Sequence, residues 1–285
     1  MLPMSQDQQS SGHKHQRSMQ LTTAALGVVF LAFMFGHLID RMIFHPEPGS
    51  DLRPEDVGVQ GEEVHLTTED GVRIHAFFLP WPGASRAILF LHGNAGNASH
   101  RLPNAAELVR LGSHVLLLDY RGYGLSEGSP DESGVYADAR AGLAYLGDEV
   151  GIPERRTVVF GRSLGGAVAV DLVQDRAIAG LILESTFPSV SAMTAKLLGA
   201  SLASLVPARF DSERKITRLQ APLLFFHGDR DEIVPYDLGR QLFDAAPEPK
   251  AFETIPGAGH NDTVQLGGRP YFERIRRFLD EVAPP

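Results

Sequence analysis

One serine of this chain stands between glycines in a pattern that suits nucleophilic chemistry. Ser163 lies in the segment Gly161-Arg162-Ser163-Leu164-Gly165, where a β-branched run ends and an Ala/Val-rich run begins. A serine on such a sharp strand-to-helix turn presents its hydroxyl for attack on an acyl carbon. The same pentapeptide also occurs by chance in ordinary turns. Catalysis therefore requires two partners elsewhere in the chain, a base and a carboxylate that orients the base.

His260 is the histidine best placed to act as the base. Among the 11 histidines it alone lies in a glycine-flanked turn, PGAGHND, after the last predicted strand. A loop at the carboxyl end of a strand is where ligand chemistry gathers in a parallel sheet. His227 lies inside an apolar strand and is interpreted as a core residue, and His92 is interpreted as ordering the turn before Gly93.

Three carboxylates follow strands at the same edge, namely Asp229, Asp231 and Glu184. Asp229 directly follows a glycine and suits a turn-capping role. Glu184 has arginines available as structural ion-pair partners. We therefore prefer Asp231 as the acid, with the other two as alternatives. The resulting order along the chain is Ser163, Asp231 and His260, the order of one particular catalytic architecture.

Two backbone amides are expected to stabilise an oxyanion. The N–H of Leu164 follows the serine at a helix N-terminus, where amides lack intrahelical acceptors and the helix dipole favours negative charge. The N–H of Asn94 lies in the loop LHGNAGNASHR, directly after a buried strand. Gly93 and Gly96 permit a sharp backbone approach in that loop.

These residues are positioned by alternating strands and helices. Residues 62–80 read as a hairpin that turns at Asp70-Gly71. Apolar runs then predict strands at 86–92, 113–120, 157–161, 179–185, 221–228 and 251–256. The segments between them predict helices at 99–111, 131–149, 164–176, 235–246 and 269–282. Continuous apolar strands separated by helices indicate an α/β fold, with a mostly parallel central sheet and helices on both faces.

Residues 187–220 form the longest connection without a predicted strand. Two alternatives stay open, a two-helix packing unit and a short helical lid inserted at the carboxyl edge. As a lid, the segment would line an apolar pocket with Met193, Leu197, Leu198, Leu202 and Leu205.

The N-terminal region departs from the rest of the chain. Residues 1–20 are polar and read as a disordered tail, whereas Leu21 to Ile39 contains no charged residue. A helix of that length spans a bilayer, so we predict a transmembrane anchor over 21–41, a linker over 42–60 and the main domain over 61–285. A cleaved signal peptide and a buried helix are the alternatives. Basic residues on both sides favour a cytoplasmic N-terminus only weakly, with the domain on the non-cytoplasmic, periplasmic or extracellular side.

Composition excludes several classes of function. The net charge of −9 argues against nucleic-acid binding, and the absence of cysteine excludes thiol catalysis and thiolate metal sites. No dinucleotide or P-loop glycine pattern is present, so no nucleotide cofactor is expected. We predict no metal and no organic cofactor.

Five motifs together resemble the α/β-hydrolase superfamily: LHGNAGNASHRLPN, LLLDYRGYGLSEGSP, VVFGRSLGGAVA, HGDRDEIVP and GAGHND. The resemblance covers residues 60–282 and is to the membrane-anchored, short-lid branch, which includes abhydrolase-domain proteins and serine aminopeptidase-like hydrolases. It implies nucleophile Ser163, acid Asp231, base His260 and oxyanion amides at Asn94 and Leu164.

The expected activity is that of a serine hydrolase that cleaves carboxylic esters or thioesters through an acyl-enzyme intermediate. The substrate would be a small-molecule or lipid-like acyl compound, or an acylated protein. An aminopeptidase-like peptidase and a non-catalytic scaffold are the alternatives. Fold and triad define a reaction class, whereas the shape of the pocket selects the substrate.

Overall fold

The computed structural model describes residues 40–204, 206 and 209–285. The chain divides into two units, Met1–Phe44 and His45–Pro285. The predicted anchor over 21–41 lies outside the described residues except for its last two positions. Among the residues that are described, no helix combines the length and the apolar character needed to cross a membrane.

The larger unit is built on an eight-stranded sheet in the order β10-β9-β8-β7-β4-β6-β3-β2. Its strands are β2 Glu62–Thr67, β3 Arg73–Leu79, β4 Ala87–Leu91, β6 His114–Leu118, β7 Thr157–Arg162, β8 Gly180–Glu184, β9 Leu223–Gly228 and β10 Lys250–Ile255. From β10 to β6 every neighbouring pair is parallel, and β3 pairs antiparallel with both β6 and β2. The predicted hairpin and mostly parallel sheet are confirmed.

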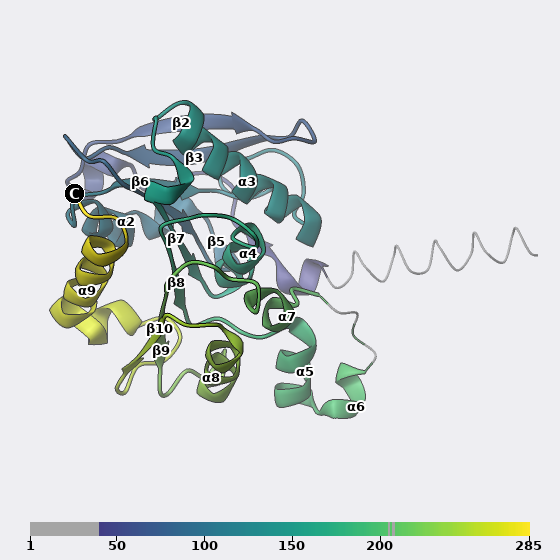
Figure 1. Cartoon of the computed structure of the whole chain (residues 1–285). Coiled ribbons are helices and arrows are strands. Elements are labelled where there is room, and N and C mark those ends of the chain that lie inside the picture. Colours follow the sequence, from purple (N-terminus) through teal and green to yellow (C-terminus); the bar gives the residue numbers. More distant parts are fainter. Residues whose placement is uncertain (1–39, 205, 207–208) are drawn as a thin grey trace, which may run out of the picture. The chain divides into compact units, whose positions relative to one another are not determined.

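Helices cover both faces of this sheet, as predicted (Figure 1). The helices are α2 Leu102–Val109, α3 Glu132–Asp148, α4 Leu164–Leu172, α8 Tyr236–Ala245 and α9 Thr263–Val282. Helices α2 and α9 contact each other on one face, whereas α3 and α4 contact each other on the opposite face. The central strands are buried on both faces, so apolar residues follow one another along each strand instead of alternating with polar ones.

The core on the α2–α9 face joins strand residues to both helices. Phe90 of β4 stacks on Phe160 of β7, with ring centroids 4.9 Å apart. Ile182 and Leu224 continue this layer toward Ile275 of α9. Dense apolar packing holds the strand ends rigid, which is what a site built at their carboxyl edge requires.

Residues 45–60 lie in the segment predicted as a linker, yet they belong to the larger unit. Strand β1, His45–Pro46, pairs in parallel with β5, Ala95–Gly96. A 3-10 helix follows at Pro54–Val57 and contacts α2. The folded unit therefore begins earlier than residue 61, and its first strand lies against the loop that follows β4.

The connection over 187–220 contains α5 Val190–Leu198, α6 Ala200–Ala203 and α7 Ser212–Ile216. None of the residues of α5 and α6 is buried, and Leu197, Leu198 and Leu202 are exposed. Helix α7 contacts α4 and α8. Leu205 lies outside the described residues. The exposed leucines do not suit a plain packing unit, because such a unit would bury them.

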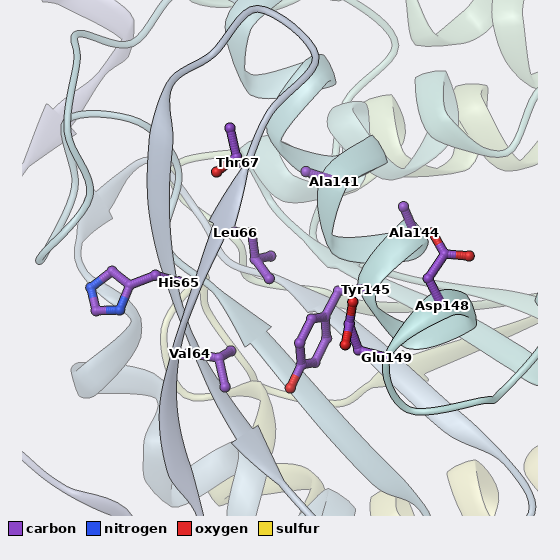
Figure 2. A pocket seen from close by; sticks show the side chains of 9 residues that line it. All are labelled: Val64, His65, Leu66, Thr67, Ala141, Ala144, Tyr145, Asp148 and Glu149. Atoms are coloured by element: carbon purple, nitrogen blue, oxygen red, sulfur yellow. The ribbon is translucent and has the colours of Figure 1, made fainter.

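A surface hollow of about 490 Å³ lies between the edge strand β2 and α3 (Figure 2). Its lining includes His65 and Leu66 of β2 and Tyr145 of α3. No residue of the predicted triad or of the predicted oxyanion loop lines it. The hollow is therefore separate from the candidate site described next.

Candidate active site

Ser163 occupies a strained turn between β7 and α4. Its φ of 53° and ψ of −119° lie in a region that side-chain-bearing residues rarely adopt, at a typical cost of about 1–3 kcal/mol. Hydrogen bonds hold this conformation: the Ser163 N–H donates to the Glu184 carbonyl at 2.8 Å, and Thr186 Oγ1 donates to the Ser163 carbonyl at 2.7 Å. The strained turn is thus held by Glu184 at the end of the neighbouring strand β8 and by Thr186 just after it.

Two glycines let the helix approach the strands closely at this turn. A Cβ at Gly161 would lie 2.4 Å from the Gly165 carbonyl oxygen, and a Cβ at Gly165 would lie 2.1 Å from the Leu91 carbonyl oxygen. The obstructing atoms belong to the backbone and cannot rotate away. The close approach therefore leaves no room for a side chain at either position.

Gly165→Ala should therefore destabilise the fold. We expect the free energy of unfolding to fall by about 1–3 kcal/mol, as for other overpacked sites. Gly147→Ala is the matched control, because a Cβ at this helical position meets nothing within 4 Å. That control should raise stability by about 0.5–1 kcal/mol. Urea unfolding measures both variants, and equal stabilities would contradict the packing argument.

The structure brings Ser163, His260 and Asp231 together. Ser163 Oγ lies 3.1 Å from His260 Nε2, and His260 Nδ1 lies 2.8 Å from Asp231 Oδ2. Asp231 can only accept when ionised, so the Nδ1 proton faces Asp231 and the Nε2 lone pair faces the serine hydroxyl. All three residues are buried. This geometry permits the imidazole to remove the serine proton.

The Asp231 carboxylate is held from several sides. Its Oδ1 accepts the N–H groups of Ile233 and Val234 at 3.0 and 2.8 Å. Burial acts to raise the pKa of this carboxyl, but contacts from His227 and His260 outweigh burial and hold the pKa below its usual range. Asp231 therefore stays ionised beside the imidazole.

His227 has a closer relation to the site than its sequence position indicates. Its interpretation as a core residue is confirmed by complete burial. Its Nε2 donates to the Val234 carbonyl at 2.9 Å and also lies 3.4 Å from Asp231 Oδ2. His227 thus contacts the Asp231 carboxylate as well as packing in the core. The sequence feature that could have indicated this contact is a polar residue near the end of an otherwise apolar strand, four positions before Asp231.

The two alternative acids are engaged elsewhere. The exposed Asp229 accepts the Gly257 N–H at 2.6 Å, which is the turn-capping role considered for it. The buried Glu184 accepts hydrogen bonds from Arg162, Thr263 and Tyr271. Neither of these carboxylates bonds the His260 imidazole, whereas Asp231 does.

The two predicted oxyanion amides belong to the start of α4 and to the loop after β4, and both segments lie next to Ser163. Leu164 is the first residue of α4, so its N–H has no intrahelical acceptor. On the other side, a Cβ at Gly93 would lie 3.4 Å from Ser163 Cβ, which places the start of the Asn94 loop beside Ser163. The Asn94 carbonyl accepts the His45 N–H at 2.9 Å and the Tyr123 hydroxyl at 2.7 Å.

His92 orients the peptide that carries the Asn94 N–H. Its Nδ1 donates to the Gly93 carbonyl at 2.7 Å. The Gly93 carbonyl and the Asn94 N–H belong to one planar peptide, so a bond to one fixes the direction of the other. His92 is fully buried beside Asp119, whose Oδ1 accepts the Ala98 N–H at 2.7 Å. His92 therefore orders this turn, as expected, by fixing the plane of the Gly93–Asn94 peptide.

Within the described part of the chain, no cluster of three or more His, Asp or Glu side chains is arranged to hold a metal ion. What the site offers is a hydroxyl, an imidazole, a carboxylate and two amides. These groups suit acyl transfer, in which a nucleophile attacks a carbonyl carbon and amides receive the negative charge.

Comparisons with known proteins agree with this fold. The family model described as serine aminopeptidase S33 matches residues 83–212. An uncharacterised protein of Mycobacterium tuberculosis is 40% identical over 85% of this chain and 88% of that protein. The α/β-hydrolase domain-containing protein WAV2 of Arabidopsis thaliana is 36% identical over 82% of this chain and 83% of that protein.

A solved structure supports the same fold. The Pyrococcus furiosus esterase Pf2001 superposes with a TM-score of 0.70, and the match covers 84% of this chain and 99% of that one. Its sequence identity of 21% makes this a likeness of fold alone. The sheet order, the serine turn and the WAV2 relationship lead to one assignment. The chain is therefore a hydrolase of the α/β-hydrolase superfamily.

Proposed function

We propose that the protein is a serine hydrolase that cleaves carboxylic ester or thioester bonds through an acyl-enzyme intermediate. The observation that carries this proposal is the continuous series of contacts from Asp231 through His260 to Ser163. The strained serine turn and the predicted oxyanion amides add support, because acyl transfer needs a positioned nucleophile and an oxyanion site.

In the proposed reaction, His260 Nε2 takes the Ser163 proton as Oγ attacks the acyl carbon. The carbonyl oxygen becomes an oxyanion, which the N–H groups of Asn94 and Leu164 would receive. His260 then protonates the leaving alcohol or thiol, and an acyl-serine ester remains. Water, deprotonated by the same imidazole, attacks this ester and releases the acid, which restores the serine.

A substrate panel tests the bond class. The full chain would be assayed with p-nitrophenyl acetate, p-nitrophenyl octanoate, an S-acyl thioester and an aminoacyl p-nitroanilide. We expect the esters and the thioester to be hydrolysed with kcat/KM at least about 10-fold above that of the anilide. An anilide preferred over every ester and thioester would replace the proposal with a peptidase.

The carboxylates near His260 do not favour the peptidase alternative. An aminopeptidase needs an acidic group that is free to bind a substrate ammonium. Here Asp229, Asp262 and Glu232 each accept a backbone N–H from residues 257–260. These bonds give the three carboxylates a role in shaping the loop that carries the base.

We also propose that residues 21–41 anchor the protein in a membrane, with the hydrolase domain on the non-cytoplasmic side. The support is the charge-free run from Leu21 to Ile39. Full-length protein should remain in the membrane fraction after an alkaline wash, and external protease should digest the domain in intact cells or spheroplasts. Release by the wash, or protection of the domain, would contradict the anchor or its orientation, respectively.

A further inference from the structure

Arg162 is the residue of the serine pentapeptide to which the proposed mechanism assigns no role. It is the last residue of β7 and directly precedes Ser163. The residue is only 6% exposed, and burying a cation is costly unless it is paired and hydrogen-bonded. The partners of the guanidinium therefore indicate what this residue does.

Two of these partners lie on the loop that carries the proposed base. Arg162 Nη2 donates to the His260 carbonyl at 2.6 Å and to Asn261 Oδ1 at 3.1 Å. Arg162 Nε donates to Glu184 Oε1 at 2.9 Å. One planar guanidinium thus joins the end of β8 to the His260 loop, which is 98 residues away from Arg162 in the sequence.

Glu184 is itself held in place by α9. Thr263 Oγ1 donates to Glu184 Oε1 at 2.8 Å, and the Tyr271 hydroxyl donates to Glu184 Oε2. Burial, together with the adjacent Glu184 carboxylate, raises the pKa of Tyr271 well above its usual value, so the hydroxyl remains a donor. The guanidinium therefore rests on a carboxylate that has little freedom to move.

We propose that Arg162 is a positioning residue that sets the place of the His260 backbone relative to the Ser163 turn. Its main chain is bonded directly to Ser163, and its side chain binds the carbonyl of His260. A single residue thereby connects the backbones of the nucleophile and of the base. This inference rests on the proposed function, because it assigns Arg162 a purpose only if His260 serves Ser163.

The simpler explanation of the buried Arg162 is that its ion pair with Glu184 only stabilises the fold. The usual energetics of buried ion pairs make this explanation insufficient. Replacing a buried ion pair with apolar residues is often neutral or stabilising, so such pairs are weak evidence for a role in stability. Catalysis is more sensitive to geometry, since a misplacement of about 1 Å can cost about 100-fold in rate. Stability and catalysis can therefore be separated by experiment.

Arg121 provides a matched control. It is also 6% exposed, and it pairs with the buried Asp138 and with Asp70. None of its hydrogen bonds reaches the His260 loop. Arg121→Met removes a comparable buried pair and should lower the melting temperature while kcat of the folded enzyme stays within about twofold of wild type.

The test compares Arg162→Met, Arg162→Lys and Arg121→Met in the full chain. With p-nitrophenyl butyrate, Arg162→Met should lower kcat about 10- to 100-fold and leave KM within about twofold. The kcat of Arg162→Lys should lie between those of wild type and Arg162→Met, because one ammonium keeps the charge but cannot reproduce the forked hydrogen bonding of the guanidinium. The rate constant for fluorophosphonate labelling of Ser163 should follow kcat.

Several outcomes would overturn the inference. If wild type is labelled at Ser163 but Arg162→Met keeps wild-type kcat, Arg162 does not position the base. If Arg121→Met loses as much kcat as Arg162→Met, general destabilisation explains both losses and Arg162 has no special positioning role. If Arg162→Met does not fold, Arg162→Lys and Asn261→Ala test the inference in its place. A wild-type kcat in both of these variants would reject the inference. A wild type that is not labelled at all instead contradicts the proposed function itself.

Discussion

Ser163→Ala should abolish ester hydrolysis while leaving the fold intact. The substitution removes the hydroxyl that we propose forms the acyl-enzyme, so kcat should fall by at least about 10⁴-fold. The methyl group occupies less space than the hydroxymethyl group it replaces, and the main chain of the strained turn stays bonded to the Glu184 carbonyl and to the Thr186 hydroxyl. Initial rates with p-nitrophenyl butyrate measure the effect.

Two controls make this result interpretable. The unfolding midpoint of Ser163→Ala should match that of wild type, which excludes loss of structure. Ser185→Ala serves as the comparison serine, because Ser185 is also buried and close in sequence to the β8 residues that hold the turn. If Ser163→Ala hydrolyses the ester at the wild-type rate, the nucleophile has been assigned wrongly.

Asp231→Asn should lower kcat by about 10³- to 10⁴-fold. An asparagine amide at this position would donate to His260 Nδ1, which forces the imidazole proton onto Nε2. The imidazole could then no longer accept the serine proton. KM should change little, because Asp231 is buried behind the imidazole.

The matched variant is Asp229→Asn, two residues earlier. Asp229 is exposed, and the amide oxygen of asparagine can still accept the Gly257 N–H. Its kcat should remain within about threefold of wild type. The opposite ranking of the two variants would show that Asp231 is not the acid of this site.

The sequence predicts most of the sheet because its central strands are continuously apolar. The run SHVLLLDY, for example, becomes β6 over His114–Leu118, and the turn at Asp70-Gly71 joins β2 to β3. The triad contacts were predictable for a related reason. Parallel strands end at one edge of the sheet, so polar residues just after them converge there.

Features set by single contacts were not predictable. Strand β1 has two residues, too few to produce a periodic pattern. The predicted helix over 269–282 is the part of α9 that follows a kink, and the short helical segment that starts at Thr263 before it was not predicted, because non-helical backbone at Gly268 separates the two. The role inferred for Arg162 depends on a carbonyl in a distant loop, which no local pattern reveals.

The central claim is that Ser163 is a nucleophile activated by His260 and Asp231. Its most direct test is to treat the full-length protein with a fluorophosphonate probe and to locate the adduct by peptide mass spectrometry. We predict one adduct, on Ser163, which is absent from Ser163→Ala and formed far more slowly in His260→Ala. No adduct on Ser163 in the folded wild type, or labelling that persists in Ser163→Ala, would contradict the account.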